Sequence, residues 1–373
     1  MPFAQLAVVK QRVQVGAPLP FNVRDANEAL LLARGQVVSC RDQMEALFAR
    51  GALVDISELS VAAHHVAEAA PQQLPALWSQ CMDDVARALL ASPHSGYARA
   101  LEDVAQPVLA LIERDPDLAI FQILRQDGNS RVQYGATHAV HAAITARLVA
   151  QRLYWEPRAA HAVFKAALTM NISMLELQGE LAQQAEPVTQ EQHDAIHSHP
   201  LRSVEMLELA GITDRDWLDA VAQHHEMPGG LGYPAGLAEV SELALLVQRA
   251  DTYTSKLSPR LKRHALAADQ AGRQMFMQDP GHPMTVALAK EFGLYPPGCH
   301  VWLANGEVGI VVRRGETVRT PLVAALINER GAPLAQPCRR DTSVRQHAVL
   351  GVIADSQISA RIAPEKLIEL ALS

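Results

Sequence analysis

Residues 224–234 read HHEMPGGLGYP, and this stretch decides how the rest of the chain is interpreted. Two adjacent histidines, His224 and His225, end a helical pattern and are followed at once by a glycine-rich loop. Glycine adopts backbone dihedrals that other residues avoid, so such a loop lets the backbone bend away while both imidazoles turn toward one point. Taken alone, the stretch fits a metal or phosphate site as well as it fits a purely structural loop.

The stretch lies within a long region of helical periodicity. From about residue 72 to 295, apolar residues recur every three to four positions, alanine is abundant and β-branched runs are few. This pattern is typical of a helical domain. A break at residues 115–117, which read DPD, divides the region. We therefore predict a helical connector over residues 56–119 and the main helical domain over residues 120–297.

Both ends of the chain carry strand-like patterns instead. Short apolar pieces separated by turn formers predict a small β-rich regulatory domain over residues 1–55, with a short helix from Arg41 to Arg50. Near the other end, residues 305–306 (NG) between two apolar runs predict a hairpin. Residues 298–373 are expected to form a β-rich cap that ends in a short helix at 364–372. The chain is thus predicted to be mainly α, with a small β-rich part on each side.

Composition narrows the classes of function. A formal net charge of -7 over 373 residues gives no basic field of the kind that nucleic-acid binders carry. The four cysteines lie far apart and form no CxxC pair, which is typical of reduced cytosolic thiols rather than of a zinc ribbon. The first residues do not read as a secretory signal, and no apolar run is long enough to cross a bilayer. We expect a cytoplasmic protein without nucleic-acid or membrane partners.

The 224–234 stretch resembles the signature of the HD-GYP class of bacterial cyclic-di-GMP phosphodiesterases, HHExxDGxGYP. It matches this signature in length and at every fixed position but one, where Gly229 replaces an aspartate. The resemblance covers about residues 130–295. It implies that the helical domain is an HD-type bundle, and it implies a protein of cyclic-di-GMP signalling.

Other landmarks of the class follow in the expected order. His141 opens the segment HAAIT where the class has HSxxV, His199 opens an HP pair, and Asp251 opens a DTY segment similar to ADxY. The resemblance implies that these residues, together with His224 and His225, are metal ligands. Imidazoles and carboxylates from several helices of one bundle are suited to a transition-metal site.

The resemblance also implies roles around these ligands. Arg260 stands where the class carries an arginine, which implies substrate binding. The loop residues Gly230, Gly232, Tyr233 and Pro234 are intact, and in this class the loop is associated with contact to diguanylate cyclase (GGDEF) domains. Members of the class use two or three metal ions, usually iron or manganese, to bind the phosphate and to generate the attacking hydroxide.

The adjacent His-Asp pair that names the class is missing. Counting back 29 residues from His199, a typical interval for the class, leads to Met170. Here Met170, Asn171, Ser173 and Met174 replace the histidine, aspartate, glycine and lysine of the class. An asparagine amide is neutral and cannot bridge two dications as the aspartate does. A methionine thioether suits copper(I) better than iron, manganese or zinc.

Two further positions bear on this interpretation. A glutamate often lies one helical turn before the first histidine of the class, but Thr137 occupies that position, and His138 is the nearby substitute. The only His-Asp dipeptide, His193-Asp194, lies six residues before His199 and is expected to face solvent. The sequence therefore predicts a degenerate domain without an assignable catalytic residue.

Several functions remain open at this point. The first is a non-catalytic signalling protein that binds cyclic-di-GMP or docks a diguanylate cyclase domain. The second is a residual phosphodiesterase, a phosphoric diester hydrolase with one iron, manganese or zinc ion on His199, His224 and His225. A scaffold without nucleotide affinity, a histidine cluster without metal and a homodimer are further alternatives.

Overall fold

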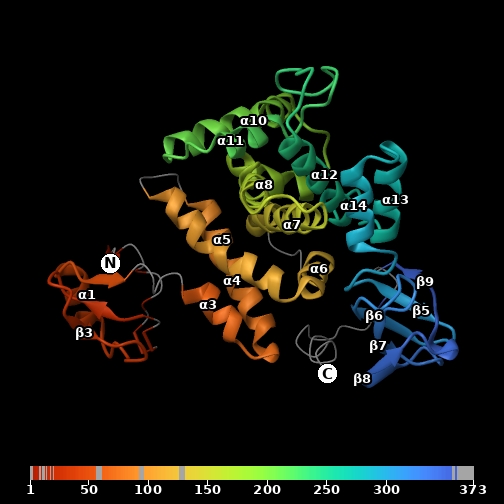
Figure 1. Ribbon diagram of the computed structural model, residues 1–373, viewed down its shortest axis with the longest axis horizontal. Helices are drawn as coiled ribbons and strands as arrows, with labels where there is room; N and C mark the ends of the chain where they lie inside the picture. The colour runs from red at the N-terminus through yellow and green to blue at the C-terminus, as the bar shows by residue number, and fades with distance from the viewer. Residues whose placement is uncertain are drawn as a thin grey trace. The chain divides into compact units, whose positions relative to one another are not determined.

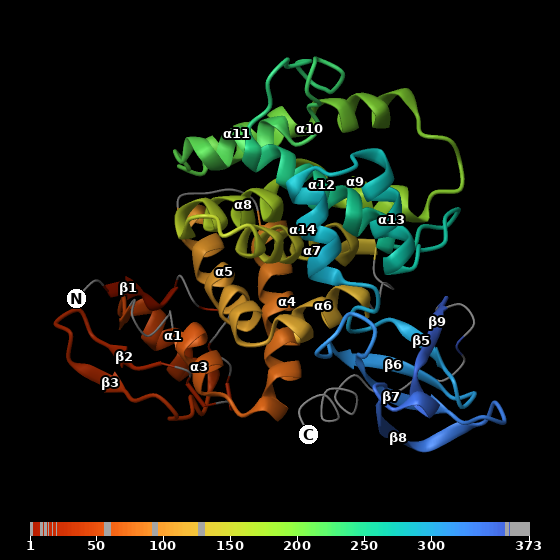
Figure 2. The ribbon, with the colours of Figure 1, turned by 45° about the vertical axis from the view of Figure 1, so that its right-hand side comes forward.

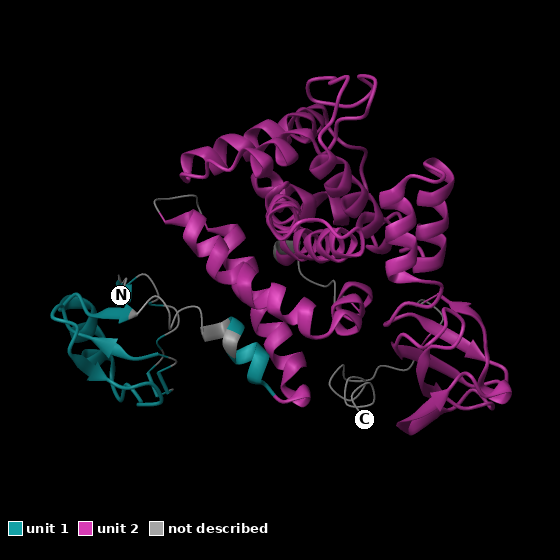
Figure 3. Ribbon diagram, viewed as in Figure 1, with its two compact units in different colours: residues 1–69 teal, residues 70–373 magenta. Residues whose placement is uncertain are grey.

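The chain divides into two compact units, residues 1–69 and 70–373 (Figure 3). The computed structural model describes residues 3–7, 10, 13, 15–16, 18–19, 21–55, 61–91, 96–125, 131–354 and 358. The mainly α architecture with a small sheet near each end confirms the predicted fold class. The predicted terminal helix at 364–372 lies outside the described residues.

The first unit is a small antiparallel sheet with two helices. Its strand order is β1-β4-β2-β3. Its core is formed by buried apolar side chains such as Leu6, Phe21 and Val54. The elements are β1 (Phe3–Gln5), β2 (Val23–Arg24), β3 (Leu30–Leu32), α1 (Arg41–Ala49), β4 (Leu53–Asp55) and α3 (Val61–Glu68). Helix α1 lies where the sequence predicted a helix. The unit extends past residue 55 to Ala69, so that it includes the first part of the predicted connector.

The second unit combines the helical bundle with a five-stranded sheet (Figure 1). Its helices are α4 (Leu74–Leu90), α5 (Tyr97–Arg114), α6 (Pro116–Leu124), α7 (Arg131–Arg152), α8 (Pro157–Thr169), α9 (Leu175–Gln183), α10 (Gln190–Leu209), α11 (Arg215–Gln223), α12 (Glu242–Leu257), α13 (Ala268–Gln278) and α14 (Pro283–Phe292). Short 3-10 turns, η2 (Pro71–Gln73), η3 (Ile172–Met174) and η4 (Arg345–His347), complete it. The predicted divisions at residues 119 and 297 fall inside this unit and stay predictions.

Helix α7 lies at the centre of the bundle and packs against α4, α8, α9, α12 and α14 (Figure 2). Alanine is the commonest of its buried residues, and short side chains let neighbouring helices approach closely. The buried alanines are Ala136, Ala139, Ala142, Ala143, Ala146 and Ala150. The alanine-rich sequence therefore produces a tight bundle in which polar side chains of α7 come close to those of α12.

The C-terminal sheet is antiparallel, with strand order β8-β7-β6-β5-β9. The Asn305-Gly306 hairpin predicted from the sequence joins β5 to β6, and Gly306 adopts the left-handed φ of +85° that such a turn needs. The strands are β5 (His300–Leu303), β6 (Val308–Arg313), β7 (Leu322–Ile327), β8 (Pro333–Asp341) and β9 (Val349–Ile353). Among the helices of the described residues, none combines the length and the hydrophobicity that crossing a bilayer requires.

Ion pairs fix this sheet to the bundle. Arg314, just after β6, contacts the carboxylates of Asp117 at the start of α6 and of Glu291 at the end of α14. Its Nη1 donates to a carboxylate oxygen of Glu291 at 2.9 Å. Asp117 and Glu291 are both buried. Removing the guanidinium would leave the buried carboxylate of Asp117 without a cation and that of Glu291 with Arg152 alone.

We therefore expect Arg314→Met to lower the free energy of unfolding by about 3 kcal/mol, the lower end of the range for a broken buried ion pair. The lower end applies because 31% of the Arg314 side chain is exposed. Urea unfolding followed by circular dichroism measures this change. Arg319→Met, at an exposed position five residues later in the same loop, is the matched control and should change stability little. Equal stability of the two variants would contradict the role of Arg314.

Candidate metal centre

Three helices with strong N-terminal caps bring the polar side chains of the site together. On α10, the Thr189 hydroxyl accepts from the backbone N–H of Gln192 while the Gln192 side chain accepts from the N–H of Thr189. The side chains of Asp214 and Ser241 cap α11 and α12 in the same way. Such caps fix where a helix begins and thus which residues face its neighbours. The sequence therefore sets the register of the three helices locally.

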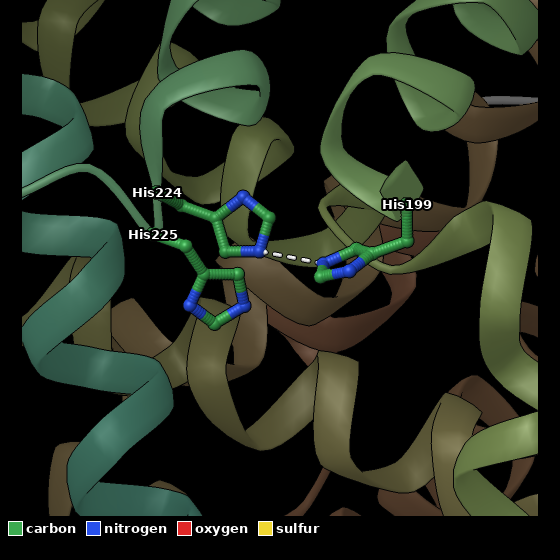
Figure 4. Close-up of side chains that lie close together, drawn as sticks. All are labelled: His199, His224 and His225. Carbon is green, nitrogen blue, oxygen red and sulfur yellow. Dashed lines mark hydrogen bonds between the residues drawn. The ribbon is translucent and has the colours of Figure 1, made fainter. Parts of the chain in front are cut away.

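Three imidazoles from two of these helices meet at one point. His199 lies in the middle of α10, and His224 and His225 follow the end of α11. Figure 4 shows His224 and His225 projecting from one segment toward His199. Each ring offers one nitrogen, and the three nitrogens lie within 4.8 Å of one another. With small side-chain shifts, such a group of imidazoles could hold one transition-metal ion.

Hydrogen bonds on the far side of two rings orient their lone pairs. His199 Nδ1 lies 2.5 Å from the carbonyl oxygen of Ile196, and His224 Nδ1 lies 2.7 Å from that of Val221. A carbonyl only accepts, so both rings donate from Nδ1, and a neutral ring then carries its lone pair on Nε2. The two Nε2 atoms face each other at 3.1 Å. Two lone pairs aimed at each other repel unless a cation lies close to both. Histidine metal ligands are typically oriented by a hydrogen bond from the other ring nitrogen, as these two rings are.

Burial keeps these rings neutral. Burial lowers the pKa of His199 to about 4, and the charge of His225 acts in the same direction. Burial also lowers the pKa of His224 well below its ordinary value and lowers the pKa of His225. Neutral imidazoles are the form that binds metal ions. The donor set of this cluster therefore fits one divalent cation.

A carboxylate from α12 lies beside the cluster. Burial alone would raise the pKa of Asp251, but the hydrogen bond from His138 and the charge of nearby imidazoles hold this pKa below its ordinary range. His138 Nε2 lies 2.7 Å from Asp251 Oδ1. Nδ1 of His138 is buried and has no hydrogen-bond partner among the described residues. Asp251 is therefore an anion that His138 positions toward the histidines.

These side chains surround a cavity of about 160 Å³. Arg260 and Tyr233 of the predicted site line the cavity. His224 does not line it and is fully buried. The lining residues are Tyr134, His138, Asn171, Met174, Gln178, Leu181, Ile196, His199, His225, Tyr233, Asp251, Ser255 and Arg260. Four of the five predicted metal ligands therefore come together: His199, His224, His225 and Asp251.

The fifth predicted ligand, His141, does not line this cavity. It is buried in α7, and burial lowers its pKa to about 3, with a further contribution from the charge of His138. His138, one turn earlier, lines the cavity and contacts Asp251. His141 therefore stays a predicted ligand, and the structure adds His138 to the residues that line the cavity.

Comparisons with known proteins agree with this geometry. A family model described as an HD domain matches residues 123–278. The cyclic di-GMP phosphodiesterase PA4108 of Pseudomonas aeruginosa is 27% identical to this chain over 241 residues, which is 63% of this chain. The chain is similar to the HD-GYP class of HD-domain proteins. The match spans 57% of the length of PA4108, so less than two thirds of that relative is represented.

A solved structure has the same fold as this chain. It is Bd1817, described as a HDG"Y"P protein from Bdellovibrio bacteriovorus, with a TM-score of 0.50 and 15% sequence identity. The superposition covers 78% of this chain and 98% of that one. At this identity the likeness concerns the fold alone.

The segment in which the sequence analysis expected the His-Asp pair of the class lies between α8 and α9. Asn171 and Met174 line the cavity, whereas Met170 is fully buried and does not. The Ser173 hydroxyl donates to the carbonyl oxygen of His199 at 3.0 Å and lies 3.0 Å from the Ser203 hydroxyl. The segment is therefore packed and hydrogen-bonded to α10, with a neutral amide facing the cavity.

Four polar residues of the lining were not predicted as site residues from the sequence, and of these only His138 was named there, as a substitute. They are Tyr134, His138, Gln178 and Ser255. Tyr134 and His138 lie four positions apart, so they share one face of α7. The Tyr134 hydroxyl and Gln178 Oε1 are buried without a hydrogen-bond partner among the described residues. The i,i+4 spacing of Tyr134 and His138 is the signal that was present in the sequence. Gln178 gave none.

The glycine-rich loop is held by one buried carboxylate. Glu226 accepts hydrogen bonds from the backbone N–H groups of Ala235, Gly236 and Leu237 at 2.7 to 3.1 Å. Gly229 and Gly230 adopt left-handed φ values of +84° and +79°. The loop is thus shaped by its own sequence rather than by the rest of the bundle.

Tyr233 of this loop belongs to the metal centre as well as to the predicted partner surface. Its ring stacks on His225, with centroids 4.6 Å apart, and on His197, with centroids 5.1 Å apart. Leu231 at the loop tip is 79% exposed, and Gly230 is exposed too. The loop tip is therefore exposed to solvent, while Tyr233 stacks against the ring of His225.

Gly232 allows the loop to fold back on itself. A Cβ atom at this position would lie 2.3 Å from the backbone nitrogen of Met227 and 2.4 Å from the Cα of Glu226. We expect Gly232→Ala to lower the free energy of unfolding by about 1 to 3 kcal/mol through this overlap. Chemical unfolding measures the effect, and Gly272→Ala, where a Cβ meets nothing within 4 Å, is the control. A Gly232→Ala variant as stable as its parent would refute the close approach.

Proposed function

We propose that this HD-GYP domain binds cyclic-di-GMP through a single metal ion and does not hydrolyse it efficiently. The protein would then act in signalling by binding the nucleotide or a partner. The observation that carries this proposal is the donor set of the cavity. Three neutral imidazoles converge there, and the amide of Asn171 stands where a second metal would require a carboxylate.

The metal in this proposal is held by His199, His224 and His225. Three imidazoles and an open position are typical of mononuclear zinc sites, and iron or manganese would accept the same ligands. Such an ion, when bound, would polarise an oxygen of the phosphodiester. Asp251 lies close enough to influence the histidines electrostatically, and it lends the site a negative charge.

A second metal is poorly supported by the same cavity. Among the described residues that line it, Asp251 is the one carboxylate, and it is already hydrogen-bonded to His138. Two dications close together repel strongly unless anionic ligands lie between them. Met174 contributes a thioether, which is a poor ligand for iron, manganese or zinc. These residues favour one ion rather than two.

The polar groups around the metal would bind the phosphodiester. Arg260 is exposed at the edge of the cavity, and the unpartnered Tyr134 hydroxyl and Gln178 side chain line it. The cavity, at about 160 Å³, is smaller than the roughly 300 to 1,000 Å³ of pockets that enclose a drug-sized ligand. It would accept a phosphodiester group while the bases lie outside. Because the cavity would enclose only the phosphodiester group, it supports weak binding of cyclic-di-GMP.

A residual phosphodiesterase is the second candidate. The facing Nε2 atoms of His199 and His224 favour it, because they support a mononuclear site. One metal cannot clamp both the attacking and the leaving oxygen, so the rate would fall several orders of magnitude below that of a dinuclear enzyme. Hydrolysis of cyclic-di-GMP by the unmodified protein that disappears in His225→Ala would favour this second function.

Isothermal titration with cyclic-di-GMP tests the first function. Metal-loaded protein is expected to bind the nucleotide, and chelated protein is expected to bind it at least tenfold more weakly. No binding in either state would contradict the proposal and favour a helical scaffold. We further propose that the loop tip at Gly230 and Leu231 contacts a diguanylate cyclase domain, which the same titration with a GGDEF domain measures.

A further inference from the structure

A second cavity lies on the other side of α12 from the metal centre. Its volume is about 680 Å³, within the roughly 300 to 1,000 Å³ of small-molecule sites. It shares no lining residue with the metal centre. Tyr253 forms part of its wall, and Tyr253 lies two positions after Asp251, on the opposite face of the same helix. The two cavities are therefore separate sites, and opposite faces of α12 form part of the wall of each.

Helices α13 and α14 form the other walls, and both ribbon views show them side by side next to α12 (Figure 1, Figure 2). Along α13, Asp269, Gly272, Arg273 and Phe276 line the cavity at spacings that place them on one face. Exposed apolar side chains surround the opening, namely Phe276 (42%), Leu294 (39%) and Val318 (69%). This cavity therefore favours a ligand with an apolar body.

Two buried polar atoms at this cavity lack a partner. The phenol oxygen of Tyr253 and Oδ1 of Asp269 are buried, and neither has a hydrogen-bond partner among the described residues. Buried polar groups in native proteins are nearly always hydrogen-bonded, since leaving one unpaired is costly. Both atoms have almost no accessible surface, so a ligand in the cavity would not contact them directly.

Cations at the opening add a preference for charge. Arg273 and Lys290 line the cavity, are exposed and form no ion pair with a described residue. Arg152, also in the lining, is already paired with Glu291. An acidic group on the outer end of a ligand would lie near Arg273 and Lys290, away from Asp269 at the inner end.

We propose that this cavity binds an amphipathic organic anion. Its apolar body would lie against α13 and α14, and its acidic group would face Arg273 and Lys290.

The probe for this proposal is 8-anilinonaphthalene-1-sulfonate, which combines aromatic rings, one N–H donor and a sulfonate. Fluorescence titration of the full chain is expected to show saturable binding of one probe per chain. Gly272→Leu should weaken it at least tenfold, because a Cβ at Gly272 meets nothing within 4 Å and the leucine side chain would fill the cavity. Leucine is also a better helix former than glycine, so the variant should fold normally.

Two further variants make the test specific. Gly351→Leu on β9, where a Cβ also meets nothing within 4 Å, adds the same side chain outside the cavity and should leave the affinity unchanged. Tyr253→Phe removes only a hydroxyl that has no accessible surface and should also leave the affinity unchanged. Unchanged affinity in folded Gly272→Leu, or several probes per chain whatever the variant, would overturn the proposal.

Discussion

Asn171→Asp, combined with Met170→His, is expected to raise the metal content from at most one ion per chain to two. Asn171 lines the cavity together with His199 and Asp251. Aspartate has nearly the same shape as asparagine, so the substitution would place an anionic oxygen in the cavity without displacing its neighbours. Met170 is fully buried and does not line the cavity. The aspartate is therefore the more important of the two changes.

The same double variant should hydrolyse cyclic-di-GMP faster than the unmodified chain, by about 100-fold to 1,000-fold. This is the usual effect of one preorganised electrostatic group on a catalysed step. Elemental analysis and product chromatography measure the two results together. Met170→Leu, which conserves volume in the buried position, is the control and should change neither. A double variant that folds, binds no additional metal and gains no activity would show that the amide is not what limits this site.

His224→Ala is expected to abolish metal retention. The ring is fully buried, its Nε2 faces that of His199 at 3.1 Å, and its Nδ1 donates to Val221. Loss of a residue that only orients a ligand costs about 10-fold to 100-fold in metal affinity, so loss of a ligand should cost more than 100-fold. Metal per chain after dialysis, with circular dichroism to verify folding, measures the change.

His193→Ala is the matched control for this variant. His193 and Asp194 form the one His-Asp dipeptide of the chain, and both are exposed on α10. His193→Ala should keep the metal content and the stability of its parent. If His193→Ala lost metal and His224→Ala kept it, the ion would have to bind elsewhere on α10.

The sequence was sufficient for those parts of the site that are encoded locally. The capping box of Thr189 and Gln192 fixes the start of α10, and ten residues later His199 reaches the cavity. The 224–234 stretch contains both the paired histidines and the glycines that its own loop requires. A short contiguous motif of this kind depends little on distant packing, and its fold could be predicted.

Which of His138 and His141 lines the cavity could not be predicted in this way. Both lie on α7, three positions apart, and a spacing of three on a helix leaves two side chains on nearly the same face. Asp251, which is distant in sequence, selects His138 through a 2.7 Å contact. The stacking of Tyr233 on His197 and His225 also depends on the path of the folded loop. Such contacts arise only from tertiary packing.

Elemental analysis of the purified chain tests the central claim most directly. One imidazole cluster, with a neutral amide at Asn171, predicts at most one iron, manganese or zinc ion per chain. Two ions per chain in the unmodified protein, bridged by the amide of Asn171 or by a carboxylate, would contradict the account.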